Sequence, residues 1–278
     1  MDQQQSSVSF DPIADRYDAT RYYPPDVAER IATGLMRLGG LAIGAHLLEI
    51  GIGTGRIALP LLAQGIDVTG VDISPRMVER LQAKYTAMQA AEPLRPWGAL
   101  DVVMADMSAL PFSDSAFDAA IAVHVFHLVS SWRRALDEVL RVVKAGGSFM
   151  LGQDVRTLEA HNRIHDKWGE IVEQLGYVTS NVGAQGYNAV VAELRERGVA
   201  VEEHVLATWE EWKVPSEALR DIVEREWSRT WRVPDDIFAE SVPRLIAWAQ
   251  AEYGSRLDMP QRGEHAFKVA RAIVPVHP

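Results

Sequence analysis

The sequence predicts an α/β fold with a doubly wound, mostly parallel sheet, and three observations support this prediction. Short apolar runs alternate with amphipathic segments between residues 41 and 155, which is the pattern of parallel strands joined by helices. Glycines stand at positions 51, 53 and 55, directly after the first apolar run, and Asp72 ends the second run. A glycine turn after a buried strand, with an acidic residue closing the next strand, is typical of nucleotide-binding sheets.

Each expected element has a local reason. Pro24 and Pro25 stand in the entry turn of a first helix, which Gly39 and Gly40 end. Ser74 is a good N-cap for a helix that carries Pro75 at its first position. Two further helices are expected over 56–63 and 131–143. Apolar runs predict seven strands, at 45–50, 66–71, 100–105, 117–123, 148–153, 199–208 and 264–275.

The regular alternation ends after residue 155. Residues 156–198 and 211–260 have helical patterns, and we interpret them as insertions that form a cap on a single domain, 1–278. Residues 10–40 precede the core of 41–155 as an N-terminal segment. Six of the eight tryptophans lie in the second half of the chain.

Composition excludes several classes of protein. The 278 residues are 47% hydrophobic and 24% charged, as in ordinary globular proteins. The absence of cysteine excludes disulfides, thiolate metal sites and thiol nucleophiles. A net charge of −10 disfavours a nucleic-acid partner. Without a long apolar stretch or the features of a signal peptide, we expect no membrane association and a cytoplasmic location. The oligomeric state is not indicated.

The glycine turn fits some ligands better than others. A dinucleotide fingerprint needs a third glycine where this chain has Arg56. A phosphate-binding P-loop would require a Gly-Lys-Ser/Thr sequence, which does not follow. A glycine-rich turn without any ligand is the remaining alternative.

Four segments in order resemble the class I S-adenosylmethionine (SAM)-dependent methyltransferases. They read LLEIGIGTGR, VTGVDISPRMVERL, VMADMSALPFSDSAFDAAIAVHVFHLV and ALDEVLRVVKAGGSFML. The resemblance is to the small-molecule branch that includes quinone-biosynthesis enzymes, methyltransferase type 11. The opening FDPIADRYDATRYYPPD also resembles the segment that covers the cofactor in many of these enzymes. The resemblance therefore implies a Rossmann-like sheet and SAM as cofactor.

The resemblance also implies roles for individual residues. The glycine loop would approach the methionine part of SAM, Glu49 would orient its amino group, and Asp72 would accept from the ribose hydroxyls. The adenine would pack on Ile73 and Met77 and meet Asp106 and the Met107 backbone. The residues implied for the cofactor in this region are Glu49, Gly51, Gly53, Gly55, Asp72, Ile73, Met77, Asp106 and Met107. As alternatives, Asp72 and Asp106 could cap a helix or turn, Met77 could be core, and Glu49 could be a solvated rim residue.

Two further groups of residues are candidates. Arg21 could pair with the cofactor carboxylate, with Tyr17 or Tyr22 in a lid; the alternative is an entry helix that only packs on the sheet. His124 would line the methionine end of the cofactor. His127 is the candidate catalytic residue, a general base if the acceptor must lose a proton, although it could equally bond only to backbone.

No metal site is expected. His161 and His165 share a helix face, but no further ligand is obvious, and we interpret them as a surface pair. The sequence predicts a SAM-dependent methyltransferase that transfers a methyl group by in-line displacement to a small, partly apolar molecule. The alternative is a SAM- or nucleoside-binding protein of the same fold without transferase activity.

Overall fold

The computed structural model describes residues 7–275, and this part of the chain divides into two compact units. The first unit consists of the segment that ends at Gln153, the segment Val182–Ala207 and the segment that begins at Phe267. The second unit consists of Asp154–Asn181 and Thr208–Ala266. Each unit has a hydrophobic core of its own.

The sheet has seven strands in the order β3-β2-β1-β4-β5-β7-β6, which confirms the expected doubly wound topology. β1 pairs in parallel with β2 and β4, β2 with β3, and β4 with β5. The sheet continues from β1 to β2 and β3 on one side and from β4 to β5 on the other, so the order reverses between β1 and β4, and β7 lies between β5 and β6. The strands are β1 (His46–Ile50), β2 (Asp67–Asp72), β3 (Leu100–Met104), β4 (Phe117–Val123), β5 (Val143–Arg156), β6 (Val201–Lys213) and β7 (Gln261–Ile273).

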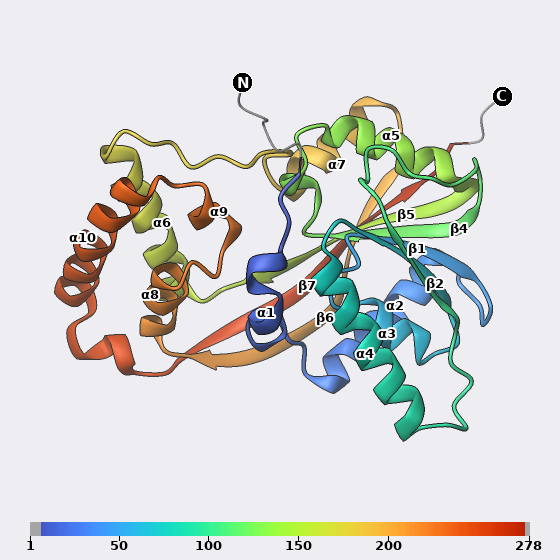
Figure 1. Ribbon diagram of the computed structural model, residues 1–278, viewed down its shortest axis with the longest axis horizontal. Coiled ribbons are helices and arrows are strands. Elements are labelled where there is room, and N and C mark those ends of the chain that lie inside the picture. Colours follow the sequence, from blue (N-terminus) through green and yellow to red (C-terminus); the bar gives the residue numbers. More distant parts are fainter. Residues whose placement is uncertain (1–6, 276–278) are drawn as a thin grey trace. The chain divides into compact units, whose positions relative to one another are not determined.

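Helices cover both faces of this sheet (Figure 1). On one face, α5 and α7 pack on side chains such as Leu48, Ala120 and Phe149. On the other face lie α2, α3 and α4 (Figure 1), and Met150 there reaches α2 at Gly39. The helices of the first unit are α1 (Ala14–Thr20), α2 (Pro25–Gly39), α3 (Ala58–Leu62), α4 (Pro75–Ala91), α5 (Trp132–Val142) and α7 (Tyr187–Glu196), with short 3-10 turns at Asp11–Ile13 and Phe126–Leu128.

Capping residues set the helix ends as the sequence predicts. The Ser74 hydroxyl accepts from the Met77 N–H, and Pro75 is the first residue of α4. Gly40 ends α2 in the left-handed conformation, with φ of 64°. These caps fix where α4 begins relative to the end of β2, and that junction is part of the candidate site.

The second unit is a helical bundle that begins where β5 ends. Its core joins side chains of α6, α8 and α10, among them Ile164, Trp168, Ile222 and Leu245. Trp168 also donates to the Ser241 hydroxyl at 3.1 Å. The helices are α6 (Glu159–Gln174), α8 (Pro215–Val223), α9 (Ser228–Trp231) and α10 (Asp235–Tyr253), followed by a 3-10 turn at Gly254–Asp258.

The helical insertions differ in extent from those expected at 156–198 and 211–260. The helix α7 belongs to the first unit, because Val190, Val191 and Leu194 pack in the same core as α5. The strand β6 continues to Lys213, beyond the expected start of the second insertion. Helical periodicity alone does not reveal which core an amphipathic helix joins.

One other expectation about this region needs correction. His161 was interpreted as part of a surface pair, but its side chain is only 5% exposed, because α6 packs against α8 and α10. The six tryptophans also have separate environments: Trp168 is in the core, whereas Trp212 is 65% exposed. Between residues 7 and 275, no helix has both the length and the apolar content needed to cross a bilayer.

Candidate functional site

The candidate site lies at the carboxyl ends of β1 and β2, beside the point where the strand order reverses. Ligands of open α/β sheets bind at such a point, because the loops after neighbouring strands diverge there. The loop after β1 begins with Gly51, whose N–H donates to Val71 O at 2.8 Å. The glycine loop is thereby anchored to the end of β2.

The three positions of this loop require glycine for different structural reasons. All three have positive φ, and a Cβ on Gly51 would lie 2.8 Å from a Val125 methyl. A Cβ on Gly55 would lie 2.3 Å from a Leu81 methyl, so this glycine lets the loop pack against α4. At Gly53 the nearest atom would be the Met77 methyl at 3.5 Å. Space for a ligand is therefore at Gly53, while Gly51 and Gly55 are required by packing.

Glu49 is a buried carboxyl beneath the loop. Its side chain is 3% exposed, which rules out the solvated rim position. Burial raises the pKa of Glu49 well above its ordinary value, and the charge of Arg56 opposes this shift. Among the described residues, Oε2 of Glu49 has no hydrogen-bond partner. A buried carboxylate oxygen without a partner is costly in a folded protein, and a ligand ammonium group would satisfy it.

Asp72 ends β2 and bonds to two backbone amides. Its Oδ2 accepts from the Gly53 N–H at 2.8 Å, and its Oδ1 accepts from the Ser74 N–H at 2.9 Å. Burial raises the pKa of Asp72, and these two bonds oppose the shift. Asp72 therefore does accept from backbone N–H groups, as its alternative interpretation as a cap expected. A carboxylate has about four acceptor sites, so two remain for a diol.

Asp106 follows β3 and is likewise bonded within the protein. Its Oδ1 accepts from the Ser108 N–H at 2.8 Å, and its Oδ2 accepts from the Ser7 hydroxyl at 3.0 Å. Burial alone would raise the pKa of Asp106, but hydrogen bonds from Ser108 and Ser7 outweigh burial and lower it. Met107 is buried beside it.

Two apolar side chains lie at the start of α4, as an adenine ring would require. Met77 is 3% exposed and reaches the glycine loop at Gly53. Ile73 is half-buried between Asp72 and the Ser74 cap. Met77 fills core space, and the same methyl borders the open side of Gly53, so the core and adenine interpretations are compatible.

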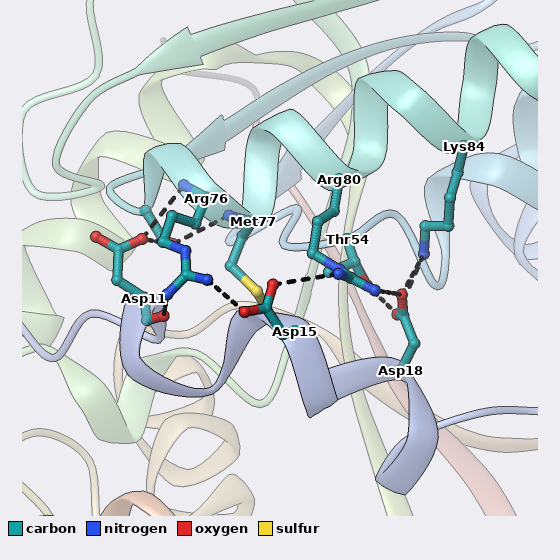
Figure 2. A network of polar contacts seen from close by, with 9 residues as sticks. Asp11, Asp15, Asp18, Thr54, Arg76, Met77, Arg80 and Lys84 are labelled. Carbon is teal, nitrogen blue, oxygen red and sulfur yellow. Dashed lines mark hydrogen bonds and ion pairs between the residues drawn. The ribbon is translucent and has the colours of Figure 1, made fainter.

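The N-terminal segment is bound to α4 by a ladder of ion pairs (Figure 2). Arg76, Arg80 and Lys84 recur every four residues, so they share one face of α4. Arg76 pairs with Asp15 at 2.5 Å, Arg80 with Asp15 at 3.4 Å, and Lys84 with Asp18 at 3.1 Å. These pairs place α1 along the helix that begins at the candidate site.

The same segment contacts the site itself. Asp11 accepts hydrogen bonds from the Ser74 hydroxyl and from the Arg76 N–H. Asp18 accepts from the Thr54 hydroxyl at 2.5 Å, and Thr54 lies within the glycine loop (Figure 2). The sequence analysis did not identify this set. The signal was available in the matching spacings of the three aspartates at 11, 15 and 18 and the three cations on α4.

The structure places the aromatic residues of this segment differently from one another. The guanidinium of Arg21 lies over the Tyr17 ring, 4.7 Å from its centroid, and 5.9 Å from that of Phe10. Tyr22 is 66% exposed. Arg21 and Tyr17 therefore form one stacked unit, while Tyr22 projects into solvent.

The two histidines after β4 differ in environment. His124 is exposed and has a φ of 52°, a conformation that side chains rarely adopt and that is frequent at functional sites. His127 is half-buried in the 3-10 turn. Burial, with a smaller effect of His124, lowers the pKa of His127 to about 4. His127 is therefore neutral and a weak base at neutral pH.

Comparison with known proteins gives a family for this region. Residues 48–151 match the model of a family described as "Methyltransferase domain", type 11. This stretch includes the glycine loop and both acidic strand ends, and it ends within β5. It covers less than half of the chain.

Similar proteins match about half of the chain. A sterol 4-C-methyltransferase of Caenorhabditis elegans is 30% identical over 129 residues, which are 46% of this chain and 37% of that protein. A demethylmenaquinone methyltransferase of Renibacterium salmoninarum is 30% identical over 152 residues, 53% of this chain and 57% of that protein. The chain thus spans about half the length of the curated relatives it matches.

Solved structures extend the similarity in fold. The crystal structure of a methyltransferase from Bacillus halodurans, itself described as putative, aligns with a TM-score of 0.56 and 16% identity. The alignment covers 88% of this chain and 99% of that one. At this identity the comparison concerns the fold alone.

Proposed function

The chain contains a class I methyltransferase domain of type 11, and from this premise we propose that it is a SAM-dependent methyltransferase acting on a small molecule. The observation that carries the proposal is the combination of Glu49 and Asp72. One is a buried carboxyl with an oxygen that lacks a partner among the described residues, and the other is a strand-end carboxyl beside the opening at Gly53. Together they suit a ligand that has an ammonium group and a ribose diol.

The described residues fit SAM without rearrangement of the fold. Glu49 would accept from the amino group, which supplies the partner that Oε2 lacks. Asp72 would accept from the ribose hydroxyls with the acceptor sites that its two backbone bonds leave. Met77 and Ile73 would border the adenine, with Asp106 as acceptor for its amino group.

The N-terminal segment would cover the bound cofactor. Asp11 and Asp18 already contact Ser74 and Thr54 at the two edges of the site. We assign the cofactor carboxylate to Arg21, which would turn from its stack on Tyr17. Such a cover excludes water from the transfer step.

When bound, SAM would supply a methyl group on a positively charged sulfur, and in-line attack of the acceptor on this methyl group would release S-adenosylhomocysteine. The chain's own part is to hold cofactor and acceptor in line and to exclude water. A neutral His127 with a pKa of about 4 would be a weak general base. His127 is better suited to donate a hydrogen bond to the methyl-acceptor molecule or to accept one from it. His124 would line the methionine end of the cofactor.

We propose a small and partly apolar acceptor. Two of the similar proteins are named for apolar acceptors, a sterol and demethylmenaquinone. The chain's net charge of −10 disfavours nucleic acid. We place the activity in the cytoplasm.

Binding of S-adenosylhomocysteine (SAH) to purified protein tests the cofactor assignment, with Asp72→Ala and Asp106→Ala as variants. Asp72→Ala should weaken binding more, because a diol offers two charge-assisted bonds and an amino group one. Each such bond contributes roughly 1.5–3 kcal/mol, so we expect a loss of at least tenfold for Asp72→Ala. Glu92→Ala is a matched control, a carboxylate at the far end of α4.

Calorimetry gives the affinities, and equal affinities for all three variants and wild type would overturn the assignment. Transfer itself is tested separately, with radiolabelled SAM and a metabolite extract. If SAH binds but no metabolite is labelled, the chain is a SAM-binding protein without transferase activity, and the transferase proposal fails while the binding site stands.

A further inference from the structure

The second unit brings together three side chains with metal-ligand chemistry. His161 and His165 lie four residues apart on α6, and Asp221 lies on α8. One ligand atom from each of the three lies within 4.8 Å of the others. The rings of the two histidines are 5.0 Å apart between centroids.

Three imidazole nitrogens of this cluster make no hydrogen bond within the described part of the protein. Both ring nitrogens of His161 and Nε2 of His165 are buried and lack a hydrogen-bond partner within residues 7–275. His161 is 95% shielded from solvent, given its 5% exposure. A buried polar atom without a partner costs roughly 1–3 kcal/mol. Three such atoms on two neighbouring rings indicate that something else satisfies them.

The fold holds the cluster in place from two sides. Ile164 and Trp168 on α6 and Ala218 and Ile222 on α8 belong to the same core, so the two helices cannot separate without exposing it. The His165 ring also packs edge-on against Trp227, with centroids 5.0 Å apart. The helices that carry the ligands are therefore held together by packing, which limits the reorganisation that binding of an ion requires.

We propose that His161, His165 and Asp221 bind one divalent first-row transition-metal ion, with Zn²⁺ as the ion used to test the site. Two imidazoles and one carboxylate disfavour Mg²⁺ and Ca²⁺, which prefer oxygen ligands. For a site of nitrogen and oxygen ligands, affinity generally rises from Mn²⁺ to Cu²⁺ and is lower again for Zn²⁺, so Zn²⁺ tests the class of ion and is not the strongest binder. Zn–N bonds of about 2.0 Å place tetrahedral ligand atoms about 3.3 Å apart, so small side-chain rotations would close the cluster.

Charge and protonation are compatible with a cation here. A metal binds the neutral form of an imidazole, and burial favours that form. Arg156 adds positive charge near both rings, Lys213 near His161 and Arg229 near His165, whereas Glu211 adds negative charge near His161. Asp221 provides the anionic ligand.

Three protein ligands leave a coordination position open, as in catalytic zinc sites. His161 and His165 line a cavity of about 400 Å³, together with Trp227, Arg156 and Arg229. The open position would take water or an anionic oxygen ligand, which the two arginines would favour. The inference does not depend on the proposed function, because every residue that carries it belongs to the second unit.

Zinc binding is measured on tag-free protein stripped of metal, by competition with a chromophoric chelator. We expect one Zn²⁺ per chain. Even an outer-shell partner of a metal site contributes about 10–100-fold to affinity, so Asp221→Asn, His161→Gln and His165→Gln should each weaken binding by at least this factor. His204→Gln is the matched control, a half-exposed histidine on β6 in the first unit.

Folding of each variant is checked by circular dichroism without metal. Should a variant not fold, zinc K-edge absorption of the wild type decides, with two imidazoles at about 2.0 Å expected in the first shell. The chain has no cysteine, so thiolate sulfur cannot contribute. A stoichiometry well below one, unchanged affinity in the three variants, or a first shell without imidazole would each overturn the proposal.

Discussion

The proposed role of Glu49 in cofactor binding opposes the stability of the ligand-free protein. Its carboxyl is buried at the end of β1, and burial raises its pKa well above the ordinary value. The folded state therefore holds a proton more tightly than the unfolded state. Stability that this group contributes is present below the unfolded pKa of about 4.5 and is lost as the pH rises through the folded pKa. At neutral pH the group destabilises the ligand-free protein.

Glu49→Gln should raise the stability of the ligand-free protein and weaken cofactor binding. One unit of pKa corresponds to about 1.4 kcal/mol, so we expect a gain on the order of 1 kcal/mol at pH 7–8 that disappears near pH 4.5. SAH affinity should fall at least tenfold, because a charge-assisted bond contributes roughly 1.5–3 kcal/mol. Urea unfolding across this pH range and calorimetry at pH 7.5 measure the two effects. A variant less stable than wild type at pH 8 would contradict the linkage.

At the scale of residues, the sequence predicted where the site residues lie in the fold better than it predicted which residues they contact. Glu49 and Asp72 lie in the last two residues of their strands and Asp106 follows β3 closely, as the apolar runs predicted. The bond from Gly53 to Asp72 was not predicted, since it depends on how two adjacent strands align. Asp221 was missed for the same reason, because it meets His161 only through packing of α6 on α8.

The N-terminal segment is an element that surface charge holds in place. Asp15 is 69% exposed, and Asp18 and Lys84 are 35% exposed. Exposed ion pairs typically contribute about 0–1 kcal/mol each and weaken as salt screens them. Ile13 and Ala14 of the segment are buried as well, so the ion pairs supply only part of its attachment, and we expect a change of charge to shift its equilibrium over a ligand by a modest factor.

Lys84→Glu should weaken SAH binding, because it places a carboxylate against Asp18. The loss of one such pair and the added repulsion predict an effect of roughly threefold to tenfold in Kd at low salt, and a smaller one in 0.5 M salt. Lys84→Arg should bind as wild type does. Arg30→Glu is the control, since it makes the same change in net charge on α2, where Arg30 pairs with Asp26. Equal Kd values for Lys84→Glu and Arg30→Glu would exclude a specific role for the ladder.

Secondary structure and topology were largely predictable at this scale, and the extent of the insertions was not. The order of strands and helices to β5 follows from two periodicities and from the caps. The helix α7 has an equally clear amphipathic pattern, yet it joins the core of the first unit through Val190 and Val191. An apolar stripe predicts that a helix is buried, but not which partner buries it.

For the molecule as a whole, the two units have separate cores and separate candidate ligands. The first core contains Leu48, Phe149 and the α5 side chains, and the second contains Ile164, Trp168 and Ile222. The cofactor residues belong to the first unit and the proposed metal ligands to the second. Since a ligand stabilises only the states that bind it, each should suppress the opening of its own unit.

Hydrogen exchange should therefore show two independent patterns of protection. SAH at 100 times its Kd stabilises by about 2.7 kcal/mol, which slows exchange about a hundredfold in amides that require its unit to open. We expect this effect in residues 10–25 and in β1, β2 and α4, and little change in α6 and α8. Zn²⁺ should protect α6 and α8 and leave the glycine loop unchanged.

Variants separate the two effects. Asp72→Ala should reduce the response to SAH and retain that to Zn²⁺, and Asp221→Asn should reduce the response to Zn²⁺ and retain that to SAH. If SAH protected α6 and α8 as strongly as β1, the two units would open together and the separation of their stabilities would be refuted. The pattern of protection, measured with each ligand alone and with both, thus tests whether two cores in one chain also mean two stabilities.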